Sequence, residues 1–469
     1  MKFRTIIFTL IAVLLSLTLV SILIPAEGFD VFGIHFSFPS IKETLFPTPT
    51  KYANIDDLVA DEHGGDTKHE YEIAKVKIGD RYISGLEYPK EDTTLLDSFF
   101  SSLQKASKTK VRILHYGDSQ IEGDRITSYI RSRLQGEFSG KGQGQMPLYS
   151  LSNIKGVTYR HSSNWFHKSI INKRDKRYNR YGIMMTACIP YVGTHVDTLT
   201  MDTTYITSAW IEMDFAKPVA NQLHLYCSNP DKNSTITITS NSETLVSKSL
   251  PITSEIIDIP ISSSNPIKKL RITATGSVQL YSVDDSQDKG VYVDNISLRG
   301  SSGWGINWND TQFISDFADL IDVDLIIMQF GVNAIPQEED KVLKSYDFFR
   351  KEYSRQLAFL KKAVPNAQII VIGSSDRSRR KGNGYETNPN VPKLIQAQRQ
   401  AAQENNCIFW DLFAAMGGEN SMPSWVLREK PLANTDFIHF NAEGAKYVAE
   451  MFYQSFNIEY QKYLSRQKK

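Results

Sequence analysis

Four residues spread along the chain have the types that acyl-transfer chemistry needs: Ser119, Asn333, Asp436 and His439. A serine hydroxyl becomes an effective nucleophile when a neighbouring base removes its proton. An imidazole serves as that base, and an aspartate on its other nitrogen fixes the tautomer and stabilises the imidazolium. Because Asp436 precedes His439 by three residues, one short turn can present both side chains. We therefore expect Ser119 as nucleophile, His439 as general base and Asp436 as its orienting acid.

The negative charge that develops on a tetrahedral intermediate needs hydrogen-bond donors. We expect them from the backbone N–H groups of Ser119 and Gly303 and from the side-chain amide of Asn333. Losing one such donor typically costs about 10²–10³ in turnover. Gly300 and Gly305 are alternatives to Gly303. Taken alone, Ser119 would equally suit the N-cap of a helix.

The elements that would position these residues form an α/β pattern. Five short apolar runs read as buried strands, "VRILHYG", "YVDNISLRG", "VDLIIMQFG", "AQIIVIGSS" and "CIFWDLF". Helical spacing between most of them predicts a five-stranded, doubly wound parallel sheet. Ligands bind beyond the carboxyl ends of such strands, which is where the serine, glycine and asparagine lie. Asp436 and His439 follow the fifth run after a long loop.

The middle of the chain has a different pattern. Between about 150 and 295, short runs of alternating β-branched residues are separated by Asn, Ser, Pro and Gly. This pattern is typical of an antiparallel β-sandwich or jelly roll. The predicted organisation is an N-terminal apolar helix, a tether, a first hydrolase part, an inserted sandwich and a second hydrolase part, at 1–25, 26–93, 94–150, 151–295 and 296–469.

The N-terminus and the charge balance bear on location and partners. Lys2 and Arg4 precede Ile6–Ile24, which holds nineteen residues without a charge. That length suits an uncleaved signal anchor in the inner membrane, with the rest of the chain facing the periplasm or the cell exterior. A cleaved signal, giving a secreted protein, is the alternative. A formal net charge of +1 argues against nucleic acid as a partner.

The four sequence blocks "GDSQ", "LRGSSGWG", "QFGVN" and "DFIH" occur in this order. In them the chain resembles the SGNH, or GDSL-type, hydrolases, whose blocks contribute a Ser, a Gly, an Asn and an Asp-x-x-His. The resemblance implies a flavodoxin-like sheet and the site roles given above. The chain departs from the family at Gln120, where Leu is usual, and at Ala334, where Asp often follows the Asn.

The layout is similar to that of exported peptidoglycan O-acetylesterases of this family, which carry a carbohydrate-binding-like β module between the first two blocks. This likeness implies a serine esterase that removes O-acetyl groups from a cell-envelope polysaccharide through an acetyl-serine intermediate, without cofactor or metal. Arg377 and Trp304 are candidates for substrate contact. One alternative is an O-acetyltransferase that passes the acetyl group to a sugar hydroxyl, working beside a membrane acyltransferase. A second is a catalytically inert glycan-binding protein.

Overall fold

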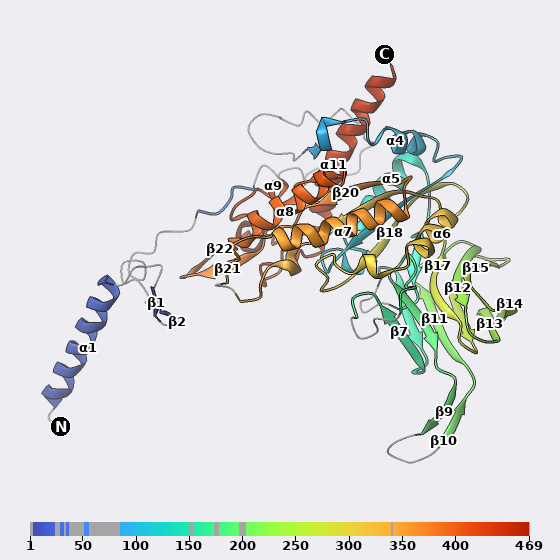
Figure 1. Ribbon diagram of the computed structural model, residues 1–469, viewed down its shortest axis with the longest axis horizontal. Coiled ribbons are helices and arrows are strands. Elements are labelled where there is room, and N and C mark those ends of the chain that lie inside the picture. The colour runs from blue at the N-terminus through green and yellow to red at the C-terminus, as the bar shows by residue number, and fades with distance from the viewer. Residues whose placement is uncertain are drawn as a thin grey trace.

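The computed structural model describes residues 3–23, 29–31, 34–36, 51–55, 85–149, 154–172, 178–196, 203–338 and 341–468. Its central sheet has the strand order β18-β4-β19-β20-β23-β3. Figure 1 labels β18 and β20 of this sheet. Its strands are β18 (Gly290–Ser297), β4 (Lys110–Gly117), β19 (Val323–Gln329), β20 (Gln368–Ile372), β23 (Ile408–Trp410) and β3 (Leu86–Glu87). The first five are parallel, as the five apolar runs predicted, and β3 pairs antiparallel with β23.

Helices cover both faces of this sheet. Against one face pack α4 (Asp97–Gln104), α5 (Thr127–Phe138), α10 (Ser421–Leu427) and α11 (Ala442–Gln467). Against the other pack α6 (Thr311–Ile321), α7 (Asp347–Ala363) and α8 (Asn390–Glu404). Strands buried on both faces explain why their sequences are almost wholly apolar. The expected mixed α/β fold with a parallel sheet is therefore confirmed.

The middle of the chain forms two antiparallel sheets around one apolar core. The first contains β6 (Val157–His161), β11 (Ala209–Phe215), β13 (Ser234–Ser240), β14 (Glu243–Leu250) and β16 (Lys269–Ala274). The second contains β7 (Trp165–Ser169), β8 (Thr186–Pro190), β12 (Gln222–Asn229), β15 (Thr253–Ser262) and β17 (Gln279–Asp284), and β5 (Gln145–Pro147) pairs with β17. We call residues 145–284 the insert. Its jelly-roll character and the domain boundaries stay predictions.

The insert is packed firmly onto the hydrolase part. The outer face of its second sheet contacts α6, where the rings of Tyr226 and Phe317 pack edge to face with their centroids 5.3 Å apart. Beside this contact, the fully buried Arg112 of β4 donates to Asp294 of β18 and to Asp284 of β17. Burying charges costs free energy unless they are paired. The guanidinium bonds to both carboxylates, and its contacts link the central sheet to the insert.

The remaining elements of the described chain lie outside these sheets and the helices that cover the central one. They are α1 (Phe3–Leu23), β1 (Phe29–Val31), β2 (Ile34–Phe36), η1 (Pro89–Glu91), η2 (Glu122–Asp124), β9 (Gly193–Val196), β10 (Thr203–Ile206), η3 (Ile306–Trp308), η4 (Val332–Ala334), β21 (Ser378–Lys381), β22 (Gly384–Thr387) and α9 (Leu412–Ala415). Strand β3 and the buried Ile55 fall within the range predicted as tether, and both contribute to the hydrolase part. The three cysteines are free and buried.

The N-terminal prediction gains no support from the structure. Within the described residues, no helix meets both the length and the apolar character that crossing a membrane requires. The signal anchor expected over residues 1–25 stays a prediction.

Candidate active site

Ser119 lies at the carboxyl end of β4, next to the middle of the central sheet. Gly117 precedes the turn because a Cβ there would lie 2.9 Å from the Gln329 carbonyl oxygen and 2.8 Å from Ile121 Cδ1. Asp118 accepts the backbone N–H of Gln120 at 2.9 Å in an Asx hydrogen bond that stabilises this turn. Helix α5 begins only at Thr127, so Ser119 does not cap it. The turn leaves the serine hydroxyl available for other contacts.

The side chains of Ser119, His439 and Asp436 form a continuous chain of hydrogen bonds. Ser119 Oγ lies 2.8 Å from His439 Nε2, and His439 Nδ1 lies 2.7 Å from Asp436 Oδ2. Asp436 Oδ1 also accepts the backbone N–H groups of Ile438 and His439. The carboxylate thus holds both the imidazole and the backbone that carries it. The N-cap of α11 is Asn441, whose side chain accepts the N–H of Gly444 at 2.9 Å.

Two residues outside the predicted set hold the His439 segment in place. The side chain of Gln120, 3% exposed, donates to the Ile438 carbonyl at 2.8 Å and accepts the Phe440 N–H at 3.3 Å. Arg125 donates to the Phe440 carbonyl at 3.0 Å. The backbone on both sides of His439 is therefore tied to the turn that bears Ser119. The amide at position 120, where related sequences carry Leu, was the available sequence signal for this function.

Two carboxylates in the site have shifted pKa values. Burial alone would raise the pKa of Asp436, but the hydrogen bonds from the backbone and imidazole of His439 and from Ile438 lower it below its usual range. Burial raises the pKa of Asp118 to about 7, although it accepts N–H groups and faces His439. Asp436 therefore stays ionised beside the imidazole, as an orienting acid must. Asp118 is close to its half-protonated point near neutral pH.

The predicted oxyanion donors lie around the same strand ends. The N–H of Ser119 has no acceptor among the described residues. The Gly303 N–H donates to Ser301 Oγ at 3.0 Å, and the exposed Asn333 amide donates to the Ser301 carbonyl at 3.0 Å. Gly303 has a φ of +84° and a Cβ there would lie 2.8 Å from Tyr353, so glycine is required. An oxyanion would have to displace the contacts to Ser301.

The two predicted substrate-contact residues lie in different surroundings. Arg377 Nη1 donates to the carbonyls of Val332 and Ile335, each at 3.2 Å. It therefore braces the turn that carries Asn333. The Trp304 ring packs edge-on against Phe348 at 5.7 Å, and Phe348 is itself 67% exposed. A role in substrate binding stays a prediction for both.

Comparisons with known proteins bear on the family that the chain resembles. Residues 279–447 match the GDSL-like Lipase/Acylhydrolase family, a stretch that includes Gly303, Asn333, Asp436 and His439 and begins after Ser119. No curated protein matches the chain. The match confirms the resemblance to GDSL-type hydrolases and, with it, the expectation of an enzyme that acts on ester bonds.

Solved structures show how far the fold is shared. A structure of a peptidoglycan O-acetylesterase matches with a TM-score of 0.63 at 19% identity, covering 80% of this chain and 99% of that chain. An acetyl xylan esterase matches with a TM-score of 0.28 at 18% identity, covering 35% and 81% of the two chains. A family two carbohydrate esterase from Cellvibrio japonicus matches with a TM-score of 0.24 at 10% identity, covering 64% and 99%. The first match shows that the fold extends over the hydrolase part and the insert together.

Proposed function

Because the chain resembles GDSL-type acylhydrolases, we propose that it is a serine esterase that removes O-acetyl groups from a cell-envelope polysaccharide, peptidoglycan foremost. The observation that carries the proposal is the hydrogen-bonded chain from Ser119 Oγ through His439 to Asp436, at 2.8 and 2.7 Å. The choice of substrate rests on the fold shared with a peptidoglycan O-acetylesterase.

The reaction follows from this geometry in two halves. His439 Nε2 takes the proton of Ser119 Oγ as the oxygen attacks the acetyl carbonyl. The Ser119 N–H and its neighbours stabilise the oxyanion, and His439 gives the proton to the departing sugar oxygen. A water molecule, deprotonated by His439, then attacks the acetyl-serine and releases acetate. Asp436 stabilises the imidazolium in both halves.

Action outside the cytoplasm is part of the proposal. It rests on the substrate, which lies in the cell envelope, and on the uncharged stretch Ile6–Ile24 that follows Lys2 and Arg4. Fractionation of cells tests it: the protein should be recovered in the envelope or exported fraction. Recovery with cytoplasmic enzymes alone would exclude this substrate in the cell.

The activity is tested with the full-length chain on O-acetylated peptidoglycan and on an aryl acetate, beside Ser119→Ala. We expect serine-dependent release of free acetate from both. Transfer of the acetyl group to an added chito-oligosaccharide, in place of release, would make the protein an O-acetyltransferase. Serine-independent release, or none from either ester, would overturn the esterase assignment.

A further inference from the structure

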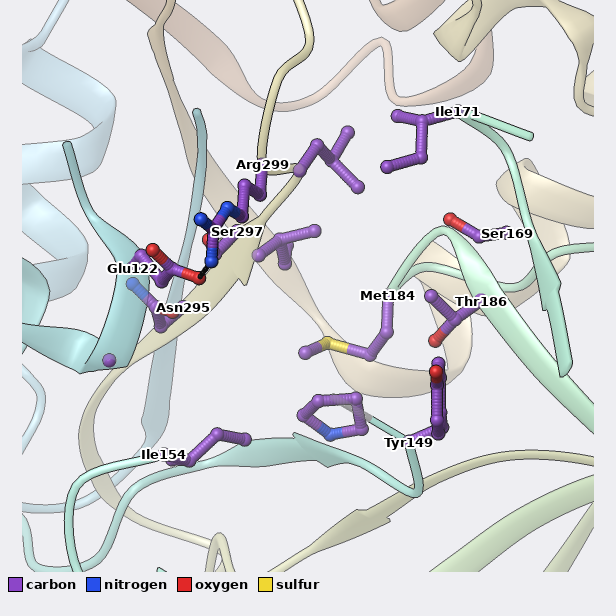
Figure 2. A pocket seen from close by; sticks show the side chains of 14 residues that line it. Glu122, Tyr149, Ile154, Ser169, Ile171, Met184, Thr186, Asn295, Ser297 and Arg299 are labelled. Atoms are coloured by element: carbon purple, nitrogen blue, oxygen red, sulfur yellow. Dashed lines mark hydrogen bonds and ion pairs between the residues drawn. The ribbon is translucent and has the colours of Figure 1, made fainter. Parts of the chain in front are cut away.

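A pocket of about 60 Å³ lies between the hydrolase part and the insert (Figure 2). One wall is the turn after Ser119 together with the end of β18, and carries Glu122, Ser297 and Arg299. The opposite wall comes from the insert and carries Ser169 and Thr186, which are paired across β7 and β8. Neither part forms the pocket alone.

The pocket adjoins the nucleophile. The backbone N–H of Glu122 donates to the Ser119 carbonyl at 3.3 Å, so the pocket wall begins one turn beyond the serine. Ser297 Oγ donates to the carbonyl of Asp118 at 3.4 Å. In such a turn the Cα atoms of residues i and i+3, here Ser119 and Glu122, lie less than about 7 Å apart. The pocket wall and the nucleophile therefore belong to the same turn, and a glycan with its ester at Ser119 would have to run over this turn to enter the pocket.

The lining has both polar and apolar character but little net charge. Its two charged residues, Glu122 and Arg299, pair with each other at 3.2 Å. The hydroxyls of Ser169 and Thr186 make no side-chain hydrogen bond within the described residues. Ile171 and the buried Met184 add an apolar surface. A neutral group with one methyl and one hydrogen-bonding end fits this lining better than a carboxylate.

The volume of the pocket is compatible with such a group. One water needs about 10–15 Å³, so about 60 Å³ has room for several non-hydrogen atoms. An acetamido group has a carbonyl, an N–H and a methyl in four such atoms. We propose that this pocket binds the acetamido group of a 2-acetamido sugar in the substrate, with the sugar ring at its mouth.

This proposal rests on the proposed esterase function and adds a specificity site to it. The methyl would lie against Ile171 and Met184, and the amide would bond to the hydroxyls of Ser169 and Thr186. The insert would then take part in substrate choice directly, through residues of its own. It follows that an acetylated glycan without acetamido groups should be a poorer substrate than one that has them.

The test is Ser169→Phe, which fills the pocket, with Ser249→Phe on the exposed part of β14 as the matched control. Kinetics are measured on O-acetylated chito-oligosaccharide, O-acetylated xylo-oligosaccharide and an aryl acetate. We expect Ser169→Phe to raise KM for the chito-oligosaccharide at least about tenfold. Turnover of the other two esters, and every activity of the control, should be unchanged.

Binding without catalysis separates the two proposals. N-acetylated chito-oligosaccharide without O-acetyl groups should bind Ser119→Ala by calorimetry and lose about tenfold in affinity when Ser169→Phe is added. Equal effects of Ser169→Phe on all three esters, or unchanged binding, would overturn the pocket assignment. If the wild-type protein shows no serine-dependent turnover of aryl acetate, the esterase function is wrong. The calorimetry would then still decide, independently, whether the pocket binds the acetamido group.

Discussion

The contact between Gln120 and the His439 segment leads to the sharpest prediction. Replacing Gln120 with Leu keeps a side chain of similar size, the one usual in related sequences. It removes the bonds to the Ile438 carbonyl and the Phe440 N–H, which sit on either side of His439. Each buried group left without a partner costs roughly 1–3 kcal/mol. The segment can recover part of this free energy only by moving, and movement takes the imidazole away from Ser119.

A displacement of about 1 Å in a catalytic geometry can cost as much as 10²-fold in rate. We therefore expect Gln120→Leu to lower kcat on an aryl acetate by roughly 10- to 100-fold, with KM changed little. Gln356→Leu is the matched control, because Gln356 is also buried and bonds to the Asn307 N–H, yet does not touch the His439 segment. A kcat for Gln120→Leu within twofold of wild type, at a loss of stability similar to that of the control, would refute the positioning argument.

Three further predictions follow from buried or charged groups. Asp436→Asn should lower kcat by about 10²–10⁴ with little change in KM, as measured on an aryl acetate, because the imidazole loses its orienting charge. Burial raises the pKa of Asp285 from 3.8 to about 6, so the folded state binds this proton more tightly than the unfolded state does. The free energy of unfolding therefore falls as pH rises from about 3.8 to about 6. Asp285→Asn should make Tm depend less on pH in this range, and an unchanged slope would contradict the argument. Arg112→Met leaves Asp284 and Asp294 buried without their counter-charge and should cost about 3–5 kcal/mol in chemical denaturation; the double variant with Asp294→Asn should recover part of that loss.

The parts of the fold and site that the sequence predicted depend on local rules. Five apolar runs could be predicted as parallel strands, because strands that are buried on both faces consist almost wholly of apolar residues. The spacing of Asp436 and His439 predicted their contact because a turn of three residues determines it. The alternation in the middle of the chain predicted antiparallel sheets around a core of their own.

The parts that the sequence did not predict depend on contacts between distant residues. Gln120 bonds to residues more than 300 positions away, so its departure from the family pattern did not reveal which groups it contacts. Strand β3 has two residues, too few for a periodic signal, and forms only because the edge of β23 is available. The occupied N–H of Gly303 depends on the rotamer of Ser301, which sequence does not encode separately.

The proposed reaction requires that each acetyl group is first transferred to Ser119 and then released by water. The most direct measurement mixes the full-length protein with O-acetylated peptidoglycan, quenches the reaction within the first turnover and determines the mass of the peptide that contains Ser119. We expect a transient gain of one acetyl group on that serine, followed by free acetate, and neither in Ser119→Ala. Acetate release with Ser119 unmodified at every time point, or undiminished release by Ser119→Ala, would contradict it.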